Sequence, residues 1–224
     1  KAHVIYLGVG EIFFQQKDQE ACRAFRRRWN VEGRHVLIVS GRTDPHKNME
    51  GTLQVFHHLL RTGLPVTLVK IGSVFTPSQR ALLDRLDLKP FVRELGMVAK
   101  EDLPRVYQSG DALLFLSWYE GFGFLAPEAM ASGTPVVVSN RGSLPEIVGE
   151  AGRIVDPGNI QEAAAALREV LTVLKVRESL IRKGKERAAT FSWRQTAAAT
   201  LSLYRDVYSK TNIQKKRTGH AATA

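Results

Sequence analysis

The sequence predicts an α/β domain: a doubly wound, Rossmann-like parallel sheet of about six strands with helices on both faces. Three observations predict this fold. Short runs of Val, Ile and Leu recur along the chain, segments with helical spacing of apolar residues separate them, and Gly or Pro marks most junctions. With 44% hydrophobic and 24% charged residues, the chain has the composition of a globular domain with a core.

The elements follow in order from these patterns. The expected strands are 35–41, 65–72, 91–95, 112–116, 135–139 and 152–156. The expected helices are 49–63, 77–88, 100–110, 125–132, 160–174, 177–191 and 193–209. The opening segment "KAHVIYLGVGEIFF" is expected to be a strand of a fold whose preceding part is absent. We expect one domain over 1–209 and a basic, disordered tail over 210–224, because "IQKKRTGHAATA" lacks periodicity.

Charge and cysteine usage narrow the partners and the compartment. A net charge of +10 favours anionic partners such as nucleotides, phosphorylated substrates or an anionic membrane surface, and we expect no nucleic acid. The arginines of "CRAFRRRWN" (22–30) form either a solvated helix face or such a membrane patch. The single cysteine, Cys22, fits a reducing compartment. The expected location is therefore the cytoplasm, with the inner face of a membrane as the second expectation.

Candidate ligand-binding residues gather at one edge of the predicted sheet. In doubly wound sheets the ligand lies beyond the carboxyl ends of the strands. The segment "SGRTDPHKN" (40–48) follows a strand and supplies two cations, Arg42 and Lys47. A guanidinium fork and an ammonium together suit a diphosphate. The alternative is a polar loop with an ordinary helix start at Asn48.

The stretch "EGFGFLAPEAMASGTPVVVSN" (120–140) predicts a glycine-rich turn, a helix and a strand. Such a turn directs backbone N–H groups toward an anion. Two carboxylates, Glu120 and Glu128, accompany the turn, and carboxylates accept hydrogen bonds from vicinal hydroxyls. A ligand with a diphosphate and hydroxyl-rich rings fits this set, and a nucleotide sugar is such a ligand.

A dinucleotide is the rival ligand. The segment "GFGFLA" (121–126) matches G-x-G-x-x-A, but that fingerprint belongs after the first strand of its unit, and here it follows the fourth. Arg141, after the next strand, could accept the phosphate of NADP. An NAD(P)-binding domain of an oxidoreductase is thus the alternative. No His, Cys and Asp cluster has metal-ligand spacing, so we expect no metal and no cofactor apart from the donor substrate.

The segment "EGFGFLAPE" resembles the E-x7-E element of retaining glycosyltransferases with the GT-B fold, family 4 (group 1). Other segments resemble that family in the same order: "GRTDPHKN", "ELGMV", "LPRVYQSGDALLFLSWY", "EAMASGTPVVVSNRGSLPEIVGEAGRIVDPGN" and "FSWRQTAAATLSLYRDVY". The similarity covers residues 3–208. It implies the C-terminal, donor-binding half of such an enzyme, with a UDP-, GDP- or ADP-sugar as donor.

The resemblance also implies roles for single residues. Arg42 and Lys47 would hold the diphosphate, together with amides of Gly123, Phe124 and Leu125.

For the rest of the nucleotide, Glu128 would bind the ribose hydroxyls. The backbone at Met97 and Val98 would meet the base, and Gly41 would belong to the same nucleotide site. Arg93 would either contact the donor or only pair structurally.

The transferred sugar would lie against Glu120, Gly121, Phe122 and Gly123. In the implied front-side mechanism the leaving diphosphate stays near the attacking hydroxyl, and Arg42 and Lys47 stabilise its charge. Arg42, Lys47 and Glu120 are thus the catalytic candidates.

The family's acceptor-binding N-terminal half has no counterpart in this sequence. It would belong to the same protein or to another chain. A non-catalytic nucleotide-sugar-binding module is the remaining alternative.

Overall fold

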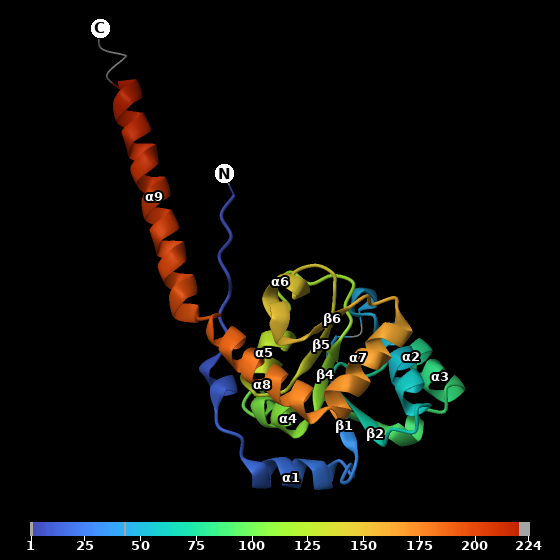
Figure 1. Cartoon of the computed structure of the whole chain (residues 1–224). Coiled ribbons are helices and arrows are strands. Elements are labelled where there is room, and N and C mark those ends of the chain that lie inside the picture. Colours follow the sequence, from blue (N-terminus) through green and yellow to red (C-terminus); the bar gives the residue numbers. More distant parts are fainter. Residues whose placement is uncertain (1, 43, 220–224) are drawn as a thin grey trace. The chain divides into compact units, whose positions relative to one another are not determined.

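The structure is a computed structural model, and it describes residues 2–42 and 44–219. Its sheet has the strand order β3-β2-β1-β4-β5-β6, and every neighbouring pair is parallel (Figure 1). The strands are β1 (His35–Gly41), β2 (Val66–Gly72), β3 (Val92–Gly96), β4 (Ala112–Phe115), β5 (Val136–Ser139) and β6 (Arg153–Val155). The predicted fold class is confirmed, with strand bounds within about two residues of those expected.

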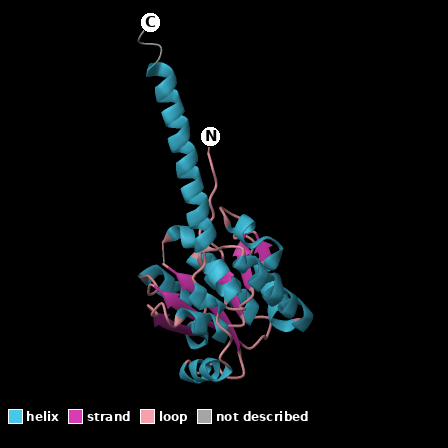
Figure 2. Ribbon diagram, turned by 90° about the vertical axis from the view of Figure 1, so that its left-hand side faces the viewer, coloured by secondary structure: helices cyan, strands magenta, loops and turns pink. Residues whose placement is uncertain are grey.

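Helices lie on both sides of the sheet (Figure 2). They are α1 (Gln19–Arg28), α2 (Met49–Leu60), α3 (Pro77–Arg85), α4 (Leu103–Ser109), α5 (Leu125–Ala131), α6 (Leu144–Val148), α7 (Ile160–Thr172) and α8 (Leu174–Ala189). Helix α9 (Trp193–Gly219) follows them in the chain. Helices α2, α3 and α7 share an apolar core with Leu37 and Val39 of β1. Because side chains alternate along a strand, Ile38 and Ser40 point to the opposite face, where α4 packs between α1 and α5.

The chain divides into two compact units, residues 1–8 with 191–224 and residues 9–190. The single domain over 1–209 that the sequence suggested stays a prediction. Helix α9 continues to Gly219, so the backbone is helical in part of the segment expected to lack structure. Residues 220–224 lie outside the described part of the chain.

The expectation of an N-terminal strand is wrong. Residues 2–10 form no strand, and a single 3-10 turn follows at Glu11–Phe14. Val4 is 79% exposed, so the apolar residues of this segment are not all core residues. The segment packs instead within its own unit: the ring centroids of Tyr6 and Phe191 lie 5.7 Å apart, and Thr196 Oγ1 donates to the Tyr6 carbonyl.

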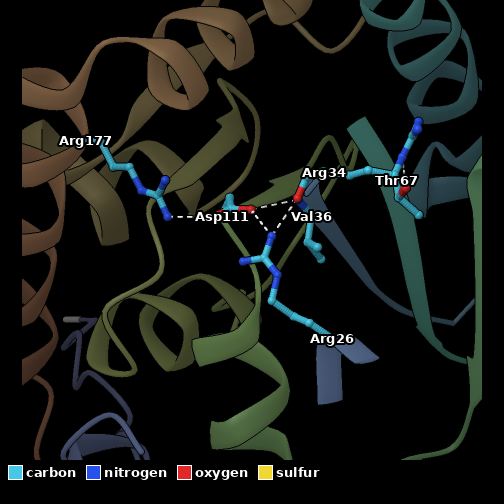
Figure 3. Close-up of polar contacts among 6 residues, drawn as sticks. All are labelled: Arg26, Arg34, Val36, Thr67, Asp111 and Arg177. Carbon is cyan, nitrogen blue, oxygen red and sulfur yellow. Dashed lines mark hydrogen bonds and ion pairs between the residues drawn. The ribbon is translucent and has the colours of Figure 1, made fainter. Parts of the chain in front are cut away.

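A buried carboxylate fixes the amino ends of the central strands (Figure 3). Asp111 directly precedes β4. Its Oδ2 accepts from the Val36 amide at 2.7 Å and from Arg26 of α1 at 2.9 Å, and its Oδ1 accepts from Arg177 of α8 at 2.6 Å. One side chain thereby joins β1, β4 and two helices at the edge opposite the candidate ligand site. Burial alone raises the pKa of Asp111, but Arg26, Arg177 and the Val36 amide outweigh it and leave that pKa below its usual range.

No helix in the described ranges is long and apolar enough to cross a membrane.

Candidate functional site

The loops that follow β1 and β4 meet at the carboxyl edge of the sheet, because the two strands are parallel neighbours. Lys47 ends a short 3-10 turn after β1, and Glu120 lies in the loop after β4. Lys47 Nζ and Glu120 Oε1 are 2.7 Å apart, and both side chains are largely buried, at 17% and 11% exposure. Lys47 Nζ also lies 5.6 Å from the centroid of the Phe115 ring. The structure therefore brings together one residue predicted to bind phosphate, Lys47, and the residue predicted to bind the sugar, Glu120.

Backbone contacts fix both partners of this ion pair. The Trp118 amide donates to the His46 carbonyl at 2.7 Å, which links the two loops beside the pair. The Ser143 amide donates to the Glu120 carbonyl at 3.2 Å. At Gly142, with φ of +58°, a Cβ would lie 2.8 Å from the backbone of Glu120, so only glycine allows this approach.

Arg42 is not part of the pair. Its side chain is 79% exposed, and its Nε lies 3.2 Å from Asp44 Oδ2. It stands in the same loop as Lys47, but it contributes little to packing. Thr43, between Arg42 and Asp44, lies outside the described residues.

Asn48 has a different role from the ordinary helix start considered above. Its backbone is left-handed, and its side chain does not cap α2. It donates instead to the Pro157 carbonyl at 3.1 Å, which anchors the end of the loop after β1.

The glycine-rich turn packs beside the end of β1. A Cβ at Gly41 would lie 3.6 Å from the Leu125 side chain, so these two predicted nucleotide contacts are neighbours. Gly123 is buried with φ of +78°, and a Cβ there would lie 2.6 Å from Leu144. Gly121 has open space around it. Phe122 and Phe124 form a ring pair with centroids 4.9 Å apart.

Glu128 lies on α5 beside the hydroxyl of Tyr107, which the sequence did not point to. Tyr107 Oη donates to Glu128 Oε2 at 3.4 Å, and Tyr107 is also hydrogen-bonded to the Ser40 side chain at the end of β1. Burial raises the pKa of Glu128 to about 7, with Tyr107 and Lys100 acting in the opposite direction. Burial also raises the pKa of Tyr107, so its phenol stays a hydrogen-bond donor. Glu128 is therefore a carboxyl group that changes charge near neutral pH.

The predicted base contacts follow β3. Met97 is 83% exposed, and both Met97 and Val98 line a cavity of about 210 Å³ that Phe25 and Trp29 of the α1 region also line. Arg93 donates from Nε to the Trp29 carbonyl at 2.8 Å. Of the two roles left open for Arg93, the structural one accounts for its contacts.

Lys70 is a further charged residue at this edge that the sequence reasoning did not single out. The sequence does contain a sign of it, because a lysine stands inside the apolar run "VTLVKIG" of β2.

In the described ranges, no three His, Cys, Asp or Glu side chains lie close enough together to form a metal site.

Comparison with known proteins identifies the family. The model of the family "Glycosyl transferases group 1" matches residues 23–187, which is more than half of the chain. This chain belongs to the group 1 glycosyltransferases. The matched range contains both loops of the Lys47–Glu120 pair and Glu128. This family match favours the predicted glycosyltransferase function over an NAD(P)-binding domain.

Relatives of this group 1 glycosyltransferase chain are longer than the chain itself. It is 32% identical over 187 residues to O-antigen chain mannosyltransferase B of Escherichia coli, covering 82% of this chain and 49% of that protein. It is 32% identical over 223 residues to a D-inositol 3-phosphate glycosyltransferase of Nocardioides, covering 92% and 48%. The chain spans about half the length of these relatives.

A solved structure has a similar fold. HepE of Anabaena, in complex with UDP and glucose, is similar with a TM-score of 0.80 at 24% identity, covering 89% of this chain and 56% of that one. The predicted architecture, one Rossmann-like half of a GT-B fold, is confirmed.

Proposed function

We propose that this domain binds a nucleoside-diphosphate sugar as the donor half of a retaining hexosyltransferase. The observation that carries the proposal is the Lys47–Glu120 pair at the carboxyl edge of the sheet. A largely buried cation beside a carboxylate supplies one group for phosphate and one for sugar hydroxyls, and both groups are held by backbone contacts. The E. coli mannosyltransferase and the HepE complex support a sugar-nucleotide donor by analogy.

Each predicted residue then has a place in the donor site. Arg42 and Lys47 bind the diphosphate and stabilise its charge as it leaves. Glu120 orients the transferred sugar, and Glu128 accepts hydrogen bonds from the ribose. The base lies along Met97 and Val98.

The donor phosphates are also expected to meet backbone amides of the glycine-rich turn, at Gly123, Phe124 and Leu125. The sugar passes over the exposed backbone of Gly121 and the Phe122 ring. No metal or further cofactor is needed in this scheme.

An acceptor-binding partner completes the proposed enzyme. The chain spans about half of its relatives, and α9 exposes an apolar stripe formed by Leu201, Tyr204 and Tyr208. We expect a facing N-terminal domain, in the same protein or another chain. We place the enzyme in the cytoplasm, in agreement with the single, free cysteine, and at the inner face of a membrane where basic residues such as Arg23 meet anionic lipid.

A ligand panel tests the function. Thermal unfolding is followed with UDP, GDP, ADP, their hexose conjugates, NAD and NADP. A ligand that binds only the native state adds about 2.7 kcal/mol of stability at one hundred times its Kd. We expect a rise in Tm with one nucleoside diphosphate and with its hexose conjugate. A rise with NAD or NADP alone would contradict it.

A further inference from the structure

Lys70 is a charged side chain inside an otherwise apolar strand, β2, and its exposure is 0%. Leu68 of the same strand belongs to the apolar core shared with α2 and α3, and alternation directs Lys70 toward the same face. Burial of an ammonium group is unfavourable unless its charge and its three N–H groups find partners. The contacts of Lys70 therefore indicate what it is there to do.

Backbone carbonyls satisfy the ammonium group. Nζ donates to Ser73 O at 2.7 Å, to Gly41 O at 3.2 Å and to Ile71 O at 3.4 Å. These three acceptors match the three donors of a lysine. Within the described ranges no carboxylate forms an ion pair with it. Burial lowers the pKa of Lys70, and the charge of Glu94, which is itself paired with Arg80 at 2.9 Å, acts in the opposite direction. The hydrogen bonds of Lys70 are thus complete, while its charge has no contacting counter-ion.

These carbonyls belong to the ends of two strands that face the donor site. Gly41 and Gly72 are register partners at the last position of β1 and β2. Both have positive φ, +118° and +95°, and a Cβ at Gly72 would lie 2.6 Å from Gly41 O. Lys70 Nζ donates a hydrogen bond to this same Gly41 carbonyl. The residue after Gly41 is Arg42, the exposed cation proposed to bind phosphate.

We propose that Lys70 is a positioning residue for the donor phosphates: its ammonium fixes the Gly41 peptide and the turn that carries Arg42, and adds a buried positive charge at that edge. The inference rests on the proposed function. A purely structural role explains the hydrogen bonds of Lys70 but not its charge, because a neutral amide could also donate to these carbonyls. An anionic ligand at the strand ends explains why a cation is kept there.

The test compares Lys70→Met, which removes charge and donors, with Lys70→Gln, which keeps an amide donor. Thr67→Val is the matched control: Thr67 is buried in the same strand, but its Oγ1 accepts from Arg34 Nε near the opposite end of β2 (Figure 3). Calorimetric titration uses UDP, GDP and ADP and the matching monophosphates. Lys70→Met is expected to weaken the preferred diphosphate about tenfold or more and the monophosphate less, because the lost charge acts on the phosphates. The diphosphate affinity of Lys70→Gln is expected to lie between those of wild type and Lys70→Met. Thr67→Val is expected to bind the diphosphate as wild type does.

A double-mutant cycle separates positioning from stability. If Lys70 acts through the Arg42 turn, the losses of Lys70→Met and Arg42→Ala are not additive. Unchanged diphosphate affinity in Lys70→Met, or equal losses on mono- and diphosphate that add to those of Arg42→Ala, would overturn the inference. If Lys70→Met fails to fold, Lys70→Gln carries the same test, and failure of both to fold makes Lys70 a core residue and also overturns it. A wild-type chain that binds no nucleotide refutes the proposed function itself, which is a separate result.

Discussion

The ammonium of Lys47 lies 2.7 Å from the carboxylate of Glu120, across the gap between the loops after β1 and β4. Each group neutralises the other in this state. A donor diphosphate would have to take over the ammonium, and the sugar hydroxyls would have to take over the carboxylate. We therefore expect the pair to couple the two halves of the proposed donor, with phosphate binding at Lys47 releasing Glu120 for the sugar.

The first prediction concerns the two cations. Arg42→Ala and Lys47→Met are each expected to weaken binding of the preferred nucleoside diphosphate by about 1.5–3 kcal/mol, the scale of a charged hydrogen bond. Arg42→Ala should leave unfolding stability almost unchanged, because its ion pair is exposed. Lys47→Met should also lower stability by about 1–2 kcal/mol, because Glu120 loses its partner. Titration and denaturant unfolding measure the two effects.

Arg182→Ala is the control for both cations, since Arg182 forms an exposed ion pair with Glu186 on α8. It should bind nucleotide as wild type does. Wild-type affinity in either site variant would remove that residue from the phosphate site.

The second prediction concerns Glu120. Glu120→Gln is expected to bind the bare diphosphate at least as tightly as wild type, because Lys47 no longer has a competing carboxylate. The same variant should bind the nucleotide sugar more weakly by about 1–3 kcal/mol, through loss of a charged acceptor. Calorimetry with both ligands measures the difference. Equal losses on the two ligands would show that Glu120 does not contact the sugar.

The third prediction concerns Glu128 and pH. The pKa of this carboxyl group is raised from 4.5 to about 7, mainly by burial. Its carboxylate form is the better acceptor for ribose, so nucleotide affinity should rise between pH 6 and pH 8, a window set by that pKa. Glu128→Gln should weaken binding of both diphosphate and nucleotide sugar and flatten this profile. A profile that keeps its slope in the variant would assign the titration to another group.

Stability should change with pH in the opposite direction to binding. A carboxyl group with a raised pKa binds its proton more tightly in the folded state, so its contribution to stability is full below 4.5 and is lost as pH rises through about 7. Glu128→Gln should remove that loss, which we expect to be about 1–3 kcal/mol. The free energies of unfolding of wild type and Glu128→Gln at pH 5 and pH 8 measure this loss of stability.

The sequence was informative where a pattern repeats or a motif has a fixed place. The apolar runs predict all six strands, and the rule for parallel sheets places Lys47 and Glu120 at one edge. It could not show that these two pair with each other, because that contact depends on loop conformation. Tyr107 and Ser40 were missed because a tyrosine in a helix and a serine at a strand end are ordinary core and edge residues.

Apolar composition alone misled at the N-terminus. "HVIYLGV" (3–9) has the residues of a strand, but a strand needs a neighbour to accept its hydrogen bonds, and this segment packs beside the first residues of α9 instead. The disordered tail over 210–224 stays a prediction, although the backbone of α9 continues to Gly219. Helical backbone needs no apolar stripe when the helix is a continuation of one already formed, because extension is easier than nucleation.

The fourth prediction concerns the Asp111 cluster at the opposite edge of the sheet. Asp111→Asn is expected to destabilise the fold by about 3–5 kcal/mol, because Arg26 and Arg177 lose their shared carboxylate in a largely buried place. Nucleotide affinity of the folded fraction should stay unchanged. Denaturant unfolding measures the first effect and titration below the transition the second.

The same cluster predicts acid sensitivity. Because the pKa of Asp111 is lowered in the folded state, its contribution is present above the unfolded pKa and is lost as pH falls through the folded one. The loss of wild-type stability below pH 3.8, the ordinary value for this carboxyl group, should be smaller in Asp111→Asn. An identical acid profile in the two proteins would assign the effect to other carboxylates.

The last prediction is that the 224-residue chain binds donor but transfers no sugar on its own. The chain spans 49% of the E. coli mannosyltransferase. We expect the acceptor hydroxyl to be oriented against the anomeric carbon by a facing domain, because transfer depends on that orientation. Donor binding by calorimetry and release of the nucleoside diphosphate are measured on the same sample, with and without sugar and lipid acceptors. The expected result is saturable donor binding with no acceptor-dependent release. Joined to an acceptor-binding half, the same chain should release diphosphate with the anomeric configuration of the sugar kept, and Lys47→Met should abolish most of that release. Robust transfer by the chain alone would mean that the acceptor binds within it, and that the exposed stripe of α9 has some other partner than a facing domain.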